Sequence, residues 1–137
     1  MKIQLKIRNA IDGQLYAAMH HSKESLLFSG DELRRKIETG AKGGTTRKWC
    51  QKRVDRWKKK VGQLVRLQTN WAADTIFGWG LILGVRSIVI GVDLDELMLD
   101  RCGCVHMTQR IYIKTFWDGD VKGKGVFIEF QYKPLLK

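Results

Sequence analysis

The chain has 137 residues, a formal net charge of +11 at pH 7, and 44% hydrophobic and 28% charged residues. Its length is that of one ordinary domain, and its five tryptophans and single proline exclude a disordered or linker-rich chain. We therefore expect a single α+β domain over residues 1–137, with an antiparallel sheet and helices packed on one face of it.

The positive charge is concentrated in one segment. Between Arg34 and Arg66 there are thirteen Lys and Arg residues against two acids, so the rest of the chain sums to zero. Charge needed only for solubility would be spread along the chain with its signs mixed. The concentration indicates an acidic partner: nucleic acid, an anionic membrane or an acidic protein.

The cysteines Cys50, Cys102 and Cys104 are odd in number, and the chain opens with alternating residues rather than an apolar run. Both features favour an intracellular, reducing compartment. The most apolar stretch, Ile76 to Val92, is short for a membrane helix and carries Arg86 and four glycines. We expect no membrane span.

The N-terminal part predicts three elements. Lys2 to Arg8 alternates between apolar and polar residues and predicts a half-buried strand, and Gln14 to His21 predicts a short helix. Ser29-Gly-Asp-Glu32 matches a capping box. It predicts a helix that begins there and ends at Gly40.

A long amphipathic helix is predicted from Thr46 onward, inside a basic helical segment of about residues 30–77. Its apolar residues follow alternating steps of four and three: Cys50, Val54, Trp57, Val61, Leu64 and Trp71. Run to Phe77, this helix would be ~48 Å long, which exceeds the width of such a domain. We expect it to bend or break near Gly62, or to project from the body.

The C-terminal half, about residues 80–133, is predicted to be rich in strands. Leu81 to Val92 is apolar and rich in Ile and Val, while Asp93 to Asp100 fits either a short helix or a loop. Ile111 to Trp117 and Val126 to Tyr132 both alternate, and the connection Asp118 to Gly125 is rich in turn residues. This pattern predicts an antiparallel hairpin.

The basic segment predicts a non-enzymatic nucleic-acid-binding protein that uses a cationic helix face for largely sequence-independent phosphate contacts. Like charges at helical spacing repel one another, so a partner that neutralises them is favoured. DNA and RNA, single and double strands, and the oligomeric state stay open. The residues expected to bind are Arg34, Arg35, Lys36, Lys42, Arg47, Lys48, Trp49, Lys52, Arg53, Arg56, Lys59, Lys60 and Arg66.

The loop from Gly40 to Thr46 suits a phosphate, because adjacent glycines allow close backbone approach and two hydroxyls can donate. It lacks the GxxxxGK[ST] spacing of a nucleotide-binding P-loop. A plain flexible connection is the other interpretation.

An alternative function is a metal-dependent nuclease. Asp93 and Asp95 directly follow an apolar stretch, a common place for carboxylates that hold Mg²⁺, and Asp118 or Asp120 could join them. Mg²⁺ is the cofactor of this alternative only; otherwise none is expected. A surface acidic patch, with Glu96, Asp100 and Glu129, explains the same residues.

Two weaker hypotheses complete the set. Cys102-Gly-Cys104-Val-His106 places soft ligands at alternate positions, which is not the usual spacing of a zinc site. His20 and His21 suggest a metal-free ribonuclease, although the sequence places no nucleophile or carboxylate beside them.

The third function class is a structural or assembly protein, such as a virion component, that docks on an acidic partner.

Overall fold

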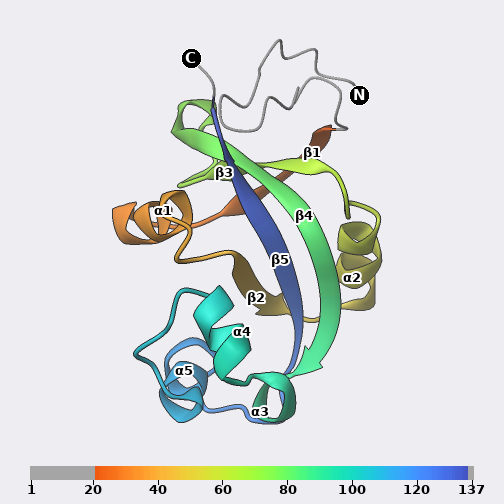
Figure 1. Ribbon diagram of the computed structural model, residues 1–137. Coiled ribbons are helices and arrows are strands. Elements are labelled where there is room, and N and C mark those ends of the chain that lie inside the picture. The colour runs from red at the N-terminus through yellow and green to blue at the C-terminus, as the bar shows by residue number, and fades with distance from the viewer. Residues whose placement is uncertain (1–20, 136–137) are drawn as a thin grey trace.

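The computed structural model describes residues 21–135, and within them five strands form one curled sheet in the order β1-β3-β4-β5-β2 (Figure 1). The strands are β1 (His21–Leu27), β2 (Gly44–Lys48), β3 (Leu64–Gln68), β4 (Ile76–Val89) and β5 (Lys124–Pro134). The β1–β3 pair is parallel and the other pairs are antiparallel. The sheet is a half-barrel whose two edges are β1 and β2.

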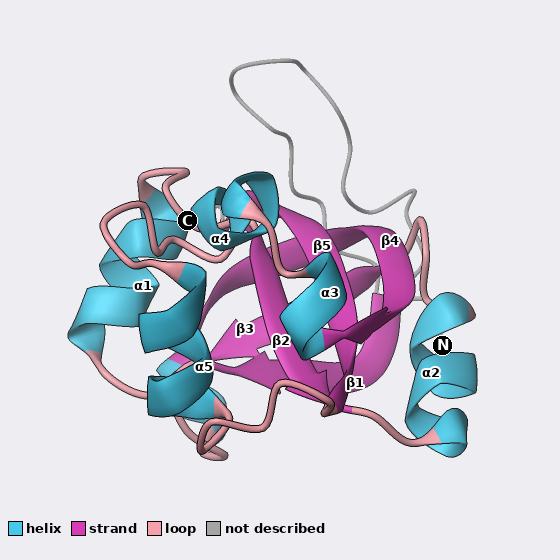
Figure 2. Cartoon of the chain, turned by 90° about the horizontal axis from the view of Figure 1, so that it is seen from below, coloured by secondary structure: helices cyan, strands magenta, loops and turns pink. Residues whose placement is uncertain are grey.

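The helices lie on both sides of this half-barrel (Figure 2). They are α1 (Asp31–Glu38), α2 (Gln51–Lys58), α3 (Ile90–Asp93), α4 (Glu96–Arg101) and α5 (Gln109–Phe116), with a short 3₁₀ turn at Ala73–Thr75. In the described part of the chain no helix is both long enough and apolar enough to cross a membrane.

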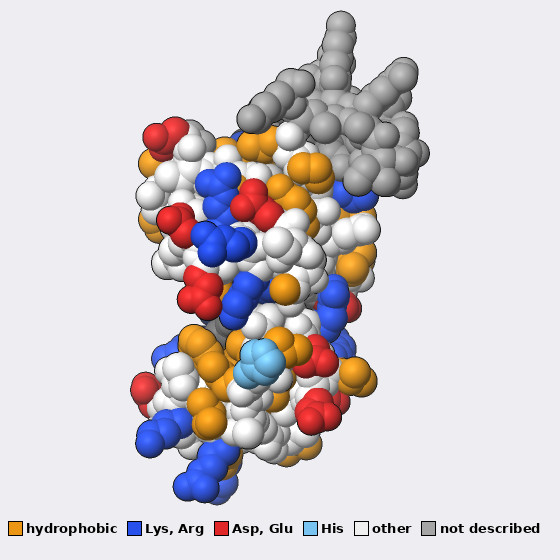
Figure 3. Space-filling view, turned by 60° about the vertical axis from the view of Figure 1, so that its left-hand side comes forward, with side chains coloured by type: hydrophobic (Ala, Val, Ile, Leu, Met, Phe, Trp, Pro, Cys, Tyr) orange, Lys and Arg blue, Asp and Glu red, His pale blue; other side chains and the backbone are white. Residues whose placement is uncertain are grey.

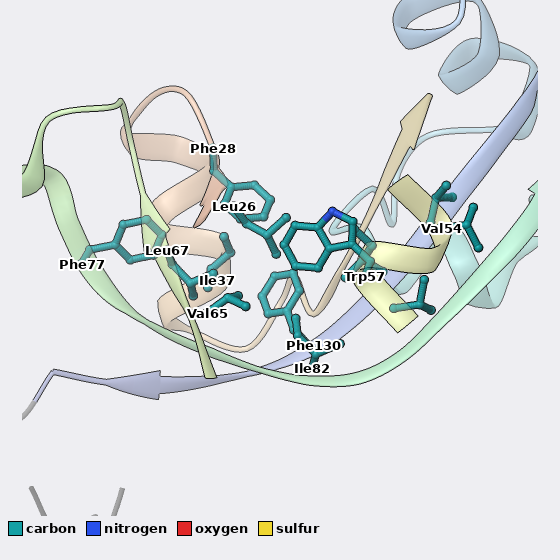
Figure 4. Packing of buried hydrophobic residues seen from close by; sticks show 13 residues of the cluster. Leu26, Phe28, Ile37, Val54, Trp57, Val65, Leu67, Phe77, Ile82 and Phe130 are labelled. Carbon is teal, nitrogen blue, oxygen red and sulfur yellow. The ribbon is translucent and has the colours of Figure 1, made fainter. Parts of the chain in front are cut away.

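The first core cluster fills the concave face of the sheet. Trp57 of α2 is 4% exposed and points toward Leu26 and Phe130, while Ile37 of α1 closes the other side (Figure 4). An aromatic side chain of this size contributes a large share of the buried apolar area of a small domain. This cluster therefore fixes α1 and α2 against the sheet.

The second core cluster lies on the opposite face of β4 and β5. Phe127 belongs to it, whereas its neighbours Val126 and Ile128 belong to the first cluster, as the alternation of side chains along a strand requires. α3, α4 and α5 cover this face, with Leu94, Met98, Leu99, Tyr112 and Ile113 buried. The expected α+β class with a mainly antiparallel sheet is confirmed, but helices cover both faces rather than one.

The prediction of a long helix from Thr46 is wrong. That segment forms β2, α2, β3 and the start of β4, and Gly62 lies between α2 and β3 with φ 84°. In β3 four of the five residues are buried and only Arg66 is half-exposed, so the stripe of an amphipathic helix does not continue there. Only Val54 and Trp57 of the apolar stripe lie within one helix, so its regular spacing comes from several elements.

The prediction of an antiparallel hairpin in the C-terminal half is also wrong. Ile111 to Trp117 falls in and just after α5, where Thr108 accepts a capping hydrogen bond from the Ile111 amide. Tyr112 and Phe116, four residues apart, stack at 4.8 Å between ring centroids. The second expected strand lies within β5, which pairs with β2 and β4 instead.

The predictions for the first helix and for the apolar stretch after Gly80 agree better with the structure. α1 is confirmed, with Gly40 just past its end at φ 82°, although its N-cap is Gly30 and no side chain caps it. Leu81 to Val92 lies mostly in β4, where the ladder shifts register between Ile82 and Gly84. Asp93 to Asp100 joins α3 to α4.

Two expected elements lie outside the described residues. These are the strand at Lys2–Arg8 and the helix at Gln14–His21, of which only His21 is described, as the first residue of β1. His20 also lies outside them.

Candidate nucleic-acid interface

The hollows that gather basic side chains lie at the opening of the half-barrel, between its edge strands β1 and β2. The inner pocket, of about 400 Å³, is lined by Leu27, Phe28, Ser29, Leu33, Lys42, Thr45, Thr46, Arg47, Lys48, Cys102, Cys104, Tyr112, Phe116 and Trp117. The edge groove, of about 420 Å³, is lined by Glu24, Ser25, Leu26, Leu27, Arg47, Lys48, Arg53, Arg56, Trp57 and Trp71. They share Leu27, Arg47 and Lys48 and so adjoin one another.

Arg47 connects the two sheet edges. Its Nη2 donates a hydrogen bond to the Leu27 carbonyl at 2.9 Å, and its guanidinium carbon lies 5.4 Å from the centre of the Phe28 ring. Thr46, the preceding residue of β2, points to the opposite face of the strand. The inner pocket therefore wraps around the edge of β2 and takes side chains from both faces.

Lys42 is 7% exposed and lies in the connection between α1 and β2. Its Nζ donates to the Gly44 carbonyl at 2.8 Å and to the Cys102 carbonyl at 2.9 Å, and it lies 5.5 Å from the centre of the Phe28 ring. Lys42 and Arg47 thus both approach the same aromatic ring. The cation–π contact is one of the few favourable interactions available to each of them there.

The adjacent glycines of this connection are needed for packing. A Cβ on Gly43 would lie 2.5 Å from Nη2 of Arg101, and one on Gly44 would lie 2.7 Å from the ring of Phe127. The Gly43 amide already donates to the Arg101 carbonyl at 2.7 Å, and its carbonyl accepts from the Phe130 amide at 2.9 Å. Any phosphate contact from this loop would therefore come from the Lys42 side chain rather than from glycine amides.

Lys42 is buried and Arg47 is half-buried, and neither forms an ion pair among the residues that the structure describes. Burial lowers the pKa of Lys42; Cys102 and Cys104 act in the opposite direction, and Arg47 and Lys36 add smaller lowering effects. Burial also lowers the pKa of Arg47, with Arg53 adding to the effect. The ion pairs found within residues 21–135 use Arg34, Lys36, Arg56 and Arg101.

Arg47 Nε is buried and has no hydrogen-bond partner among the described atoms. Burying a charge is costly unless an opposite charge or hydrogen bonds compensate it. Lys42 and Arg47 are therefore positioned to gain from any anion that enters the inner pocket.

A hydroxyl pair completes the polar wall of the pocket. The Tyr112 Oη and Thr46 Oγ1 atoms lie 2.6 Å apart, and whichever accepts keeps its own proton for another acceptor. Burial raises the pKa of Tyr112 above its ordinary value, and it raises the pKa of Cys102 beside it as well. Both groups stay neutral near pH 7, so neither offsets the positive charge of Lys42 and Arg47.

The edge groove adds exposed cations and an aromatic ring. Arg53 and Arg56 reach it from α2, and Arg56 pairs with Glu24 of β1 at 3.7 Å between Nε and Oε1. The Arg53 guanidinium also donates to the Lys48 carbonyl. Trp71 lines the groove with 78% of its surface exposed, an unusual state for the largest apolar side chain.

Five of the thirteen residues expected to bind line these hollows: Lys42, Arg47, Lys48, Arg53 and Arg56. The other cations are dispersed: Arg34, Arg35 and Lys36 on α1, Lys52 on α2, Lys59 and Lys60 after it, and Arg66 in β3. Arg34 pairs with Glu38, and Lys36 donates to the Gly103 carbonyl. On the face that carries α1, basic and acidic side chains are intermixed (Figure 3).

Trp49 lies away from both hollows. Its indole N–H donates to the Ser87 hydroxyl at 3.3 Å, and the Lys124 ammonium lies 5.4 Å from the centre of its ring. Sequence reasoning placed Trp71 on an apolar stripe and gave no role to Tyr112. The exposure of Trp71 and the position of Tyr112 depend on the tertiary fold, and no local pattern marks them.

The acids of the nuclease hypothesis make local contacts. Asp93 accepts from the Val89 amide at 2.7 Å, Asp95 caps α4 by accepting from the Met98 amide, and Asp120 accepts from the Lys122 amide. Asp118 has a positive φ of 51° in a turn. Within residues 21–135 no group of three or more His, Cys, Asp and Glu side chains is placed to hold a metal ion.

Comparisons with known proteins find similarity at the level of structure. No family model and no curated protein matches the chain. Protein EF3133 from Enterococcus faecalis V583, of family DUF984, has a TM-score of 0.56 and 13% identity, covering 84% of this chain and 82% of that one. Hypothetical protein PH0355 has a TM-score of 0.53 and 16% identity, covering 80% and 95%.

A third solved structure, a mutant of ZmASCH from Zymomonas mobilis, has a TM-score of 0.49 and 13% identity, with 81% of this chain and 70% of that one covered. The likeness is one of fold. The function of this chain has to be argued from its own residues.

Proposed function

We propose that the protein is a non-enzymatic nucleic-acid-binding protein that holds a single strand in the edge groove. The observation that carries this proposal is the composition of the groove, in which Lys48, Arg53 and Arg56 line the same hollow as the exposed ring of Trp71. Proteins that bind single strands combine cations along the backbone path with aromatic rings on which bases stack. Both parts are present in one hollow between the sheet edges.

A single strand suits this surface better than a duplex. α2 has eight residues and buries Val54 and Trp57 against the sheet, so it does not project as a helix that could enter a major groove. The cations of the edge groove surround a concavity, and a flexible strand can follow a concavity that a rigid duplex bridges. We expect largely sequence-independent contacts, because the groove cations recognise phosphates.

The experiment is a titration of a fluorescently labelled oligonucleotide, followed by anisotropy between about 50 and about 300 mM salt. Counterion release predicts that log K falls linearly with log salt, at about −0.7 per phosphate neutralised on a single strand. The double variant Arg53→Gln, Arg56→Gln should lower the magnitude of this slope by about 1.4.

The matched control is the double variant Lys58→Gln, Lys59→Gln. It removes the same charge from the C-terminal end of the same helix, and neither lysine lines the groove. The control should keep most of the wild-type slope. Equal losses in the two variants would reduce the interaction to net charge, and no binding at the lowest salt would refute the proposed function.

A further inference from the structure

In the inner pocket, unlike the edge groove, positive charge is withdrawn from water without a carboxylate partner among the described residues. Arg56 of the groove is exposed and pairs with Glu24, whereas Lys42 is buried, Arg47 is half-buried, and neither has a carboxylate partner among the described residues. Lys42 has two carbonyl acceptors, and Arg47 has one, with its Nε left without a partner. Carbonyl dipoles reduce the cost of these charges but cancel neither of them.

The charge of the pocket selects the kind of anion. An internal phosphate of a nucleic acid is a diester with one negative charge, whereas a phosphomonoester carries about −1.5 to −2 near pH 7. The two positive charges of Lys42 and Arg47 match the charge of the phosphomonoester better than that of the diester. Arg47 and the hydroxyl pair of Thr46 and Tyr112 line the pocket from either side of the β2 edge, and together they offer several donors to a group with three strong acceptor oxygens.

The remaining walls suit an organic group attached to the phosphate. Leu33, Phe116 and Trp117 also line the pocket, so an anion there would lie in a hollow that includes apolar and aromatic surface. A volume of about 400 Å³ lies in the range of small-ligand sites. Because the pocket shares Arg47 and Lys48 with the edge groove, a strand in the groove can place its last residue here.

We infer that the inner pocket is a receptor for a phosphomonoester, the terminal phosphate of a nucleic-acid strand that lies in the edge groove. The strand part of this inference rests on the proposed function. The phosphate part rests on Lys42 and Arg47 alone. A free nucleotide offers the same chemistry, and the experiment separates the two sources.

The test uses three otherwise identical thymidine octamers that compete with the labelled strand: one with a 5′ phosphate, one with a 3′ phosphate, and one with hydroxyls at both ends. One phosphorylated octamer should bind about tenfold more tightly than the unphosphorylated one. The phosphate at the opposite end adds the same charge outside the pocket and serves as the control. No gain at either end, or the same gain at both ends, overturns the inference and leaves the proposed function intact.

Variants locate the effect in the pocket. Lys42→Gln should abolish the gain from the end phosphate, while Lys36→Gln, which removes a half-buried cation outside the pocket, should retain it. If Lys42→Gln fails to fold, the comparison of the three octamers on the wild-type protein still tests the inference. Tyr112→Phe should reduce the gain from the end phosphate by less than Lys42→Gln does. Retention of the full gain in a folded Lys42→Gln variant also refutes the inference.

Phosphorus NMR of thymidine 5′- and 3′-monophosphate with the wild-type protein covers the case in which no octamer binds. Saturable broadening of one resonance that Lys42→Gln removes assigns the pocket to free phosphomonoesters and refutes the strand-end part. No broadening refutes the pocket as a phosphate site altogether.

Discussion

The hydroxyl pair of the inner pocket allows a double-mutant cycle whose size follows from its geometry. Tyr112 is 5% exposed and Thr46 is half-buried, and their oxygens lie 2.6 Å apart. Tyr112→Phe keeps the ring packing and frees the Thr46 hydroxyl to turn toward water, so it should cost about 1 kcal/mol of unfolding free energy. Thr46→Val leaves the buried phenol without its hydroxyl partner and should cost about 1–3 kcal/mol.

The double variant should be less destabilised than the sum of the single variants by about 1 kcal/mol, which is the coupling energy of the pair. Urea unfolding at equilibrium measures each free energy, and a cost of about 1 kcal/mol corresponds to a melting-temperature shift of about 3–5 °C for a chain of this size. Tyr132→Phe is the matched control, because its hydroxyl bond to the Phe77 carbonyl is long, at 3.5 Å. Strict additivity of the two single variants would contradict the assigned hydrogen bond.

Three further predictions follow from the core, the loop and the charge of the pocket. Trp57→Ala should lower the unfolding free energy by about 3–5 kcal/mol in urea titrations, and a loss below about 1 kcal/mol would contradict its central place in the first core cluster. Gly44→Ala should cost about 1–3 kcal/mol in the same assay because of the Phe127 ring, whereas Gly84→Ala, with nothing within 4 Å, should cost far less. In competition assays the gain from the end phosphate should shrink below about pH 6, as the phosphate takes up its second proton. The same gain should shrink again at alkaline pH, as the pH rises through the lowered pKa of Lys42 and the ammonium loses its charge; a gain constant across this range would refute the charge argument.

The distribution of charge was the most informative feature of the sequence. The segment with the net charge supplies Lys42, Arg47, Lys48, Arg53 and Arg56 to the two hollows, although it does so from a loop, a strand and a short helix instead of one long helix. The charge of a segment depends only on its residue types, so it is predicted correctly even when the secondary structure is not. The position of a side chain on a helix face is predicted correctly only if the helix is.

The errors in secondary structure have a common cause. The stripe from Cys50 to Trp71 and the alternation of Ile111 to Trp117 are both local patterns of apolar spacing, and neither identifies the elements that its residues join. Partners far along the chain decide between strand and helix. β3 is a strand because β1 and β4 bond to its two sides, and α5 is a helix because Tyr112 and Ile113 face the second core cluster.

An open half-barrel leaves two strand edges whose backbone groups could pair with a strand of another molecule, a common route to aggregation. Here the edges carry Glu24 on β1 and Arg47 and Lys48 on β2, and the Arg47 side chain occupies the Leu27 carbonyl. We expect these charges to disfavour pairing of the sheet edges with copies of the protein. Variants that neutralise Arg47 or Lys48 should be checked for self-association by light scattering before any loss of binding is attributed to the ligand.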